Sequence, residues 1–472
     1  MLNVGLFGIG LDTYWPQFPG LRDRLVGYQD RIAERIRAGG QVTLTDVGLV
    51  DSPGAARAAA STFRRSEVDL VVLFISTYAL SHTVLPVAQR VGAPVLVLNL
   101  QPVAAIDYDA LNALGDRGAM TGEWLAHCQA CVAPELSSVF RRAGLPVHLV
   151  SGYLDDPLAW SAIDDYLAAA RVVVGLRASR VGVVGHYYNG MLDVYSDLTK
   201  LAATFGCHFE LREFGEIKAG IEAATDDAVA SKRRDFATTF AVSADCSEAE
   251  LDRAARTAVG LEGFVAEHDL QALAYYYEGT GDAAYQNLIT SVIPGFTLLT
   301  GRGVPVAGEC EVKNALAMKI MDLLGAGGSF SEFYAMDFND EVILLGHDGP
   351  AHFAMAAGAV GLVPVPVYHG KPGSGLSIQM EVAAGPVTLL SVCQGAAGEV
   401  YLLVAEGESV AGPTLRIGNT NSRYRFGLPI REWMDRWAKA GPSHHCAIGR
   451  GHRAGALRQV AALLGIEVLE IK

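Results

Sequence analysis

The chain has little of what would place it outside the ordinary globular proteins. No run approaches the ~18 uninterrupted apolar residues of a membrane span, and no basic segment followed by a long apolar stretch opens the chain, so we expect a cytoplasmic protein. Basic residues are scarce, since 37 Lys and Arg against 51 Asp and Glu give a net charge of −14. That balance argues against nucleic acid or an anionic membrane as the main partner, whereas a neutral small molecule is easily accommodated.

Cysteine is also sparse. Seven cysteines, an odd number, are spread along 472 residues, so no disulfide framework is predicted. Cys128 and Cys131 form a CxxC pair that could bind zinc or act in redox chemistry, but a structural or pocket-lining role is favoured because no second pair accompanies it. The Gly8-Ile9-Gly10 turn lacks the third glycine of a dinucleotide fingerprint, so a nicotinamide site is not expected.

Apolar residues are plentiful, at 50% of the chain, and can bury a large core over about three domains. Continuous apolar runs at 69–75 and 94–100, separated by helical periodicity, indicate strands buried on both faces of a parallel sheet. We predict an α/β fold in which two doubly wound parallel-sheet domains (1–170 and 171–326) precede an antiparallel β-rich, barrel-like domain (327–472).

The predicted elements of the second and third domains follow from local patterns. A helix at 157–177 leads to a strand at 180–185, and the runs 260–265 and 275–277 indicate further strands whose tyrosines could stack on a sugar. A helix at 312–323 is stopped by Gly325. Short apolar runs separated by Gly or Pro turns predict an antiparallel meander of strands at 361–368, 376–382, 387–392 and 400–405. A helix at 454–464 and a strand at 467–471 close the chain.

Ionisable residues mark a candidate site. Glu309 ends a short apolar run, Glu332 is expected in a loop after the next helix, and His347 follows another apolar run. Adjacent histidines, His444 and His445, come about a hundred residues later. Taken singly, each is as readily a structural polar residue, but together they would be costly to bury without a cation. Two carboxylates and two imidazoles form a shell that suits Mn²⁺, Co²⁺ or Zn²⁺.

The segments around these residues resemble the metal-site motifs of the L-arabinose isomerase family and, more distantly, the L-fucose isomerases. In chain order the motifs are GECEVK at 308–313, SFSE at 329–332, LGH at 345–347 and GPSHH at 441–445. The match covers the last 170 residues well. The segments 74–81, 99–101 and 185–197 are similar more loosely.

The resemblance implies roles for individual residues. Glu309, Glu332, His347 and His445 would bind Mn²⁺, with Co²⁺ or Mg²⁺ able to substitute, and Glu309 and Glu332 would also move the protons. The residues expected at the sugar are His444, Met191, Tyr78, Gln101 and His186. Neighbouring side chains on extended backbone point opposite ways, so one of the two histidines can ligate while the other lines the pocket. The family also implies a homo-oligomer, a hexamer or another trimer-based assembly.

We therefore predict a metal-dependent aldose–ketose isomerase that acts on a free sugar through an enediol. A divalent cation chelated by O1 and O2 would stabilise the enediolate, while the two glutamates remove and return the proton. Two alternatives stay open. One is a metal-dependent sugar epimerase that uses the same residues, and the other is a non-catalytic sugar-binding or regulatory protein, which would not need the four-residue shell.

The chain departs from the family at the sugar end of the site. The family carries a His-Gly motif downstream of the position of Gln101, and here the corresponding segments, 111–117 and 121–124, contain none. Tyr78 stands where the family has Phe. Because buried polar groups left unpaired cost ~1–3 kcal/mol each, a rebuilt pocket should reject the old substrate. We expect L-arabinose to be a poor substrate and another aldose to be preferred.

Overall fold

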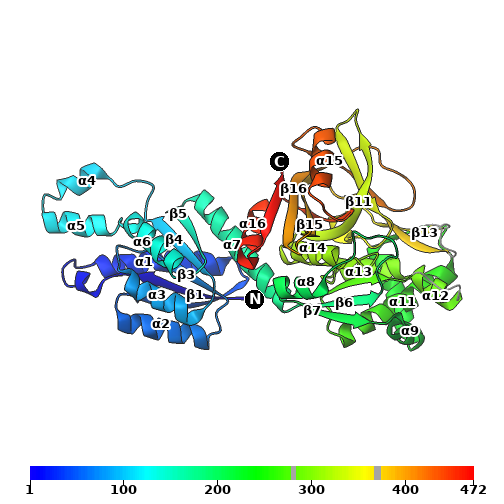
Figure 1. The fold of residues 1–472 in the computed structure, drawn as a ribbon, viewed down its shortest axis with the longest axis horizontal. Coiled ribbons are helices and arrows are strands. Elements are labelled where there is room, and N and C mark those ends of the chain that lie inside the picture. Colours follow the sequence, from blue (N-terminus) through cyan, green and yellow to red (C-terminus); the bar gives the residue numbers. More distant parts are fainter. Residues whose placement is uncertain (278–282, 366–373) are drawn as a thin grey trace. The chain divides into compact units, whose positions relative to one another are not determined.

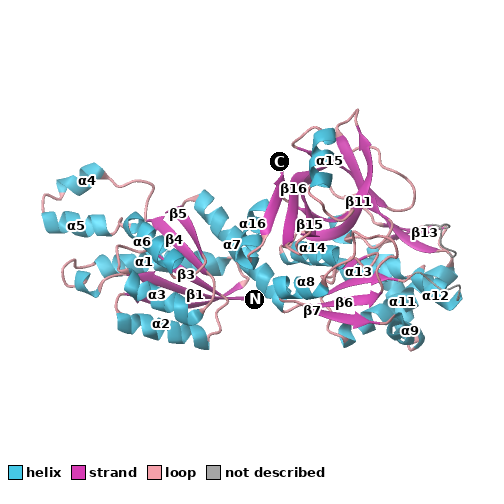
Figure 2. Ribbon diagram, viewed as in Figure 1, coloured by secondary structure: helices cyan, strands magenta, loops and turns pink. Residues whose placement is uncertain are grey.

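The computed structural model describes residues 1–277, 283–365 and 374–472 (Figure 1). The chain divides into two compact units, residues 1–174 and 175–472. The predicted fold class is confirmed, because two parallel sheets flanked by helices precede a closed β-barrel (Figure 2). None of the helices in the described ranges combines the length and apolar character that a bilayer crossing requires.

The first unit is built on a five-stranded parallel sheet in the order β2-β1-β3-β4-β5. Its strands are β1 (Leu2–Ile9), β2 (Val42–Val50), β3 (Leu70–Phe74), β4 (Val95–Gln101) and β5 (Val147–Tyr153). Its helices are α1 (Leu21–Ala38), α2 (Pro53–Arg65), α3 (Ser81–Val91), α4 (Tyr108–Ala113), α5 (Arg117–Leu125) and α6 (Gln129–Arg142), with a 3-10 turn at Asp12–Tyr14. Apolar side chains of α2, α3 and α6 pack on the sheet, and α1 contributes to a separate cluster with β2.

Helix α7 (Pro157–Arg177) is confirmed at the predicted residues and precedes a second parallel sheet in the order β10-β9-β6-β7. The strands are β6 (Arg180–Gly185), β7 (His208–Arg212), β9 (Ala272–Tyr276) and β10 (Val306–Ala307). The helices are α8 (Leu198–Phe205), α9 (Phe214–Glu222), α10 (Asp226–Thr239), α11 (Glu248–Glu267), α12 (Ala283–Ile289), α13 (Val292–Gly301) and α14 (Val312–Leu323). Strand β7 lies on one side of β6, and β9, which follows later in the chain, lies on the other side of β6. The strand order therefore reverses at β6.

The predicted strand at 260–265 is wrong, because these residues lie inside α11. The apolar run continues a helical stripe of buried side chains, Leu251, Ala254, Ala258, Leu261 and Val265. Gly260 faces α9 so closely that a Cβ atom on it would lie 2.7 Å from the backbone nitrogen of Ile221. The helix is therefore buried along this stripe, and a buried helical turn has the same apolar composition as a short buried strand.

The C-terminal part of the second unit contains the predicted barrel. Its strands are β11 (Gly327–Asp337), β12 (Val342–His347), β15 (Gly385–Gln394), β16 (Val400–Val410), β17 (Thr420–Phe426) and β18 (His445–Arg450). Their order is β15-β18-β11-β12-β17-β16, and β16 pairs again with β15, so the six strands close into a ring. Strand β19 (Glu467–Ile471) adds to β16 in parallel, next to α15 (Ile430–Lys439) and α16 (Ala454–Leu464).

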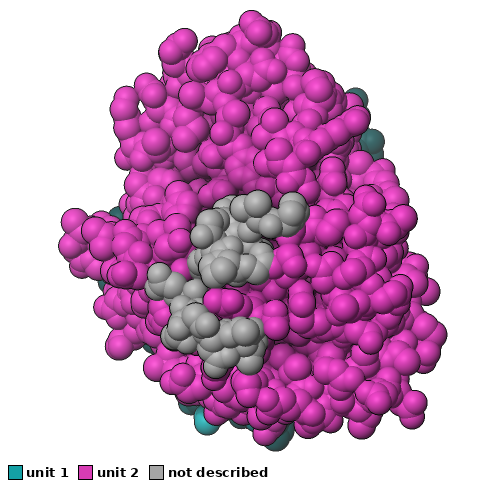
Figure 3. Space-filling model, turned by 90° about the vertical axis from the view of Figure 1, so that its right-hand side faces the viewer, with its two compact units in different colours: residues 1–174 teal, residues 175–472 magenta. Residues whose placement is uncertain are grey.

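The first two strands of the predicted meander do not join this ring. Strands β13 (Gly361–Val365) and β14 (Gly375–Gln379) form a separate sheet with β8 (Ala241–Val242). Residues 366–368, the end of the predicted 361–368 strand, lie outside the described residues. Helix α14 is buried at every position from Val312 to Met321 and packs against both β9 and the barrel strands β11, β15 and β18. The sheet and the barrel thus form one continuous body (Figure 3), and the predicted domain boundary at 326 stays a prediction.

Candidate active site

Glu309 lies at the carboxyl edge of the second parallel sheet, two residues after β10. This is the edge where open α/β sheets bind ligands, close to the reversal of strand order. Glu309 and Cys310 both have φ of 56°, a left-handed conformation that costs a non-glycine residue of order 1–3 kcal/mol. Hydrogen bonds hold the turn, since Cys310 N–H donates to Tyr275 O (2.8 Å) and Glu311 N–H donates to Gly308 O (3.0 Å). The turn fixes the position of the Glu309 carboxylate.

Glu332 lies inside strand β11, so its predicted place in a loop is wrong. The chain forms a strand there because β12 and β18 supply pairing partners on both sides. Glu332 is opposite Gly346 of β12 and opposite His445 of β18, and His347 follows Gly346. The ladder therefore brings three of the predicted metal ligands side by side on adjacent strands.

The four predicted metal ligands form a cluster together with His444. Ligand atoms of Glu309, His347 and His445 lie within 4.8 Å of one another, and so do those of Glu332, His444 and His445. The carboxylate Oε2 of Glu309 and Nε2 of His445 are 3.5 Å apart, yet both atoms are buried and neither makes a hydrogen bond within the described structure. Buried polar atoms are normally satisfied, so these two fit ligands of a cation.

Glu311, which sequence reasoning left without a role, holds His445 in place. Its Oε2 is 2.5 Å from Nδ1 of His445, and both residues are 1% exposed. A hydrogen bond from Nδ1–H to a carboxylate keeps the ring proton on Nδ1. Nε2 then has a free lone pair and is a stronger metal ligand. Phe330 packs against the rings of His347 and His445, with centroids 4.5 and 4.3 Å away. The sequence signals for Glu311 were its place in the GECEVK motif and its position two residues after Glu309.

His444 is anchored differently, by Asp193 in the segment between β6 and α8. Asp193 Oδ2 lies 2.6 Å from His444 Nδ1 and accepts from the His444 backbone N–H at 3.0 Å, while His444 Nε2 is 3.5 Å from Glu309 Oε2. Burial opposes protonation, but the nearby carboxylates of Glu309 and Asp193 raise the pKa of His444 to about 9. Burial likewise pushes the pKa of Glu309 upward, yet His444, His445 and His347 together lower it on balance. Sequence reasoning missed Asp193.

A cavity of about 230 Å³ opens onto this cluster. Its polar end is formed by Glu309, Glu332, His347, Asp348 and His444, and its walls by Tyr188, Met191, Tyr275, Tyr276, Tyr277 and Ile289. The rings of Tyr188 and Tyr276 are 4.4 Å apart. Aromatic walls around a few convergent polar groups suit a small polar ligand.

The remaining predicted sugar contacts fall in different places. Met191 lines the cavity, and His186 stands edge-on to Tyr276 with ring centroids 5.5 Å apart. Tyr78 and Gln101 belong to the unit of residues 1–174, where Gln101 Nε2 donates to the backbone oxygens of residues 103 and 104. The roles of all four residues in sugar binding stay predictions.

The Cys128-x-x-Cys131 pair has the features of a structural site. Cys128 is buried and packs with a small apolar cluster, whereas Cys131 is exposed. Burial, together with Cys131, raises the pKa of Cys128 to about 12, so its thiol is not a ready thiolate. The metal-ligand clusters found among the described residues do not include this pair.

Comparison with known proteins points to sugar isomerases. Residues 351–472 match the family model of the L-fucose isomerase C-terminal domain. The chain is 20% identical to L-arabinose isomerase 1 of Bacillus licheniformis, over 86% of this chain and 81% of that protein. It is 22% identical to the L-arabinose isomerase of Vibrio parahaemolyticus, over 91% of this chain and 86% of that protein. The resemblance inferred from the motifs is confirmed.

Proposed function

We propose that this chain, a relative of the L-arabinose isomerases over most of its length, is an aldose–ketose isomerase that acts on a free sugar. The observation that carries the proposal is the convergence of Glu309, Glu332, His347 and His445 at the polar end of a tyrosine-walled cavity. A pure sugar binder needs the aromatic walls but gains nothing from two carboxylates directed at two imidazoles.

The same four residues would hold a divalent cation, and we propose Mn²⁺ as its identity. Carboxylate and imidazole donors together suit Mn²⁺, and the unsatisfied atoms of Glu309 and His445 lie where such an ion would be ligated. When bound, the cation would supply positive charge that stabilises the negative charge developing on the sugar oxygens. Glu311 fixes the His445 ring, so this part of the shell is arranged before any ion arrives.

The proton transfer is assigned to the two glutamates. Moving a carbonyl from C1 to C2 removes one proton from C2 and returns one to C1. The lowered pKa of Glu309 keeps its carboxylate ionised at neutral pH, as a proton acceptor must be. Glu332, on strand β11, faces the same cavity from the barrel side and would deliver the second transfer. Protonated His444 can donate to a sugar oxygen while Asp193 holds its ring.

The experiment is to incubate the Mn²⁺-loaded protein with a panel of aldopentoses and aldohexoses in deuterated water. We expect a ketose carrying solvent deuterium at C1. An epimeric aldose as the product would instead favour the epimerase. A protein that binds sugar without turning over any member of the panel, and that contains no stoichiometric metal, would favour the non-catalytic alternative. Glu341→Gln is a matched control for the glutamine variants of Glu309 and Glu332. Glu341 accepts a hydrogen bond from the backbone N–H of Ile430 and lies outside the cavity.

A further inference from the structure

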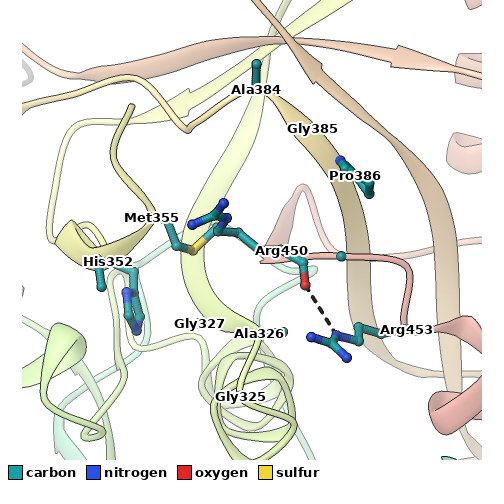
Figure 4. Close-up of a pocket in the computed structure, with 12 residues that line it drawn as sticks. Gly325, Ala326, Gly327, His352, Met355, Ala384, Gly385, Pro386, Arg450 and Arg453 are labelled. Carbon is teal, nitrogen blue, oxygen red and sulfur yellow. Dashed lines mark hydrogen bonds between the residues drawn. The ribbon is translucent and has the colours of Figure 1, made fainter. Parts of the chain in front are cut away.

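A second cavity, of about 440 Å³, lies at the other end of the strands that carry the metal ligands. It is lined by Gly327, which begins β11, and by Arg450, which ends β18 (Figure 4). Both residues are five positions along their strands from Glu332 and His445, which corresponds to ~17 Å at ~3.3 Å per residue. The cavity is therefore distinct from the candidate active site.

The charged residues of this cavity are all of one sign. Among the lining residues are Arg450 and Arg453 but no carboxylate. Figure 4 shows both arginine side chains extending into the space beside Ala326, Gly327 and Met355. Arg453 Nε donates only to the backbone oxygen of Arg450 (3.3 Å), and neither guanidinium has an ion-pair partner in the described part of the chain.

The two arginines differ from those arginines of the chain that pair with carboxylates. Arg24, for example, pairs with Glu123 at 2.5 Å, and Arg233 pairs with Glu248 and Asp252 at 2.7 Å each. At the start of helix α16, beside Arg453, the Ala454 N–H already has a partner, because it donates to Glu406 at 2.8 Å.

A buried histidine lines the same cavity. His352 is 7% exposed, and its buried ring nitrogen Nδ1 makes no hydrogen bond within the described residues. Burial lowers its pKa, so the ring is neutral at pH 7 and carries one N–H donor. Asp322, the carboxylate whose charge acts on His352, is held by Lys319 at 2.7 Å. A buried ring nitrogen without a partner is costly, which points to a ligand that satisfies Nδ1.

We propose that this cavity binds the phosphate group of a small organic phosphate, with Arg450 and Arg453 as charged donors and His352 as a third, neutral donor. Two guanidinium charges match a dianionic phosphomonoester, and arginine is suited to phosphate oxygens. A carboxylate would use only one of the two charges. The volume lies within the ~300–1,000 Å³ of small-molecule pockets and exceeds what phosphate alone fills. Met355 and Pro386 offer apolar surface for the organic part. The assignment does not depend on the proposed isomerase activity.

The test is calorimetric titration of the full chain with glycerol 3-phosphate, inorganic phosphate and acetate at constant ionic strength. We expect saturable binding of glycerol 3-phosphate at one site per chain, weaker binding of inorganic phosphate, and none of acetate. Arg450→Gln and Arg453→Gln should each weaken binding at least about tenfold, as loss of a charged hydrogen bond does. Arg416→Gln, which removes the same charge from an exposed residue outside the cavity, should bind as the wild type does.

Several outcomes would overturn the assignment. Binding that does not saturate, or that is equal in the wild type and both arginine variants, would mean that the anion binds nonspecifically and not in this cavity. Inorganic phosphate binding at least as tightly as glycerol 3-phosphate would exclude an organic ligand. Loss of binding in Glu309→Gln, with retention in the arginine variants, would place the anion at the active site. Because Arg450 is exposed, its variant should melt at the wild-type temperature without ligand, which separates lost binding from lost folding.

Discussion

Replacing Glu311 by glutamine should weaken metal binding although Glu311 is not among the proposed ligands. In the wild type its carboxylate accepts from Nδ1–H of His445, in a pair that is almost fully buried. Glutamine has nearly the same shape, so packing should be retained. Its amide is neutral, and its NH₂ group can donate to Nδ1, which would move the ring proton to Nε2. The tautomer that can ligate would then be less populated.

The expected loss of Mn²⁺ affinity follows from the contact of Glu311 with only one of the proposed ligands, His445. Loss of a partner that orients a metal-binding histidine typically costs ~10–100-fold in metal affinity, or ~1.4–2.7 kcal/mol. We expect the Mn²⁺ dissociation constant, measured by calorimetry or chelator competition, to rise within that range. Turnover should return at saturating Mn²⁺, because Glu311 does not line the substrate cavity.

The outcome can contradict this reasoning in two ways. An affinity within about twofold of wild type would mean that the carboxylate does not control the His445 tautomer, since the typical cost is ~10-fold or more. Turnover that stays low at saturating Mn²⁺ would mean that Glu311 acts in the reaction itself. Glu341→Gln, the same substitution at a carboxylate outside the cluster, should leave both affinity and turnover unchanged.

Four further predictions can be checked. Glu309→Gln and Glu332→Gln should each reduce turnover by ~10²–10⁴-fold with the fold intact, and activity within about tenfold of wild type would contradict their roles. In metal-free protein, the raised pKa of His444 contributes stability that is fully present below its unfolded pKa of ~6.5 and is lost as pH rises toward about 9. Asp193→Asn should reduce this decline in melting temperature with pH, and an unchanged profile would show that Asp193 does not support the charged ring. Light scattering at micromolar concentration should show a homo-oligomer, consistent with a trimer or hexamer, and a monomer would refute it. L-arabinose should have a lower kcat/KM than at least one other aldose, and a panel in which it ranks first would overturn the claim of a rebuilt sugar end.

The sequence by itself determined the elements whose signals are local. The helices at 157–177 and 454–464 and the strands at 180–185 and 467–471 have the predicted bounds. Their periodicity and terminal residues lie within the segment itself, so no distant partner was needed to identify them. The four predicted metal ligands were assigned from short motifs that resemble those of the L-arabinose isomerases, and the structure brings these residues together.

Only the tertiary structure decided the features that depend on distant partners. The run 260–265 is helical because it packs against α9, and Glu332 is in a strand because β12 and β18 flank it. Glu311 and Asp193 gain their importance from histidines 134 and 251 residues away. Such contacts leave no periodic trace in either segment, because chain folding brings the two groups together and each group is, in its own sequence context, an ordinary surface-type carboxylate. The parallel sheet and the closed barrel supply that proximity, so the sequence could name the proposed ligands but not the residues that hold them.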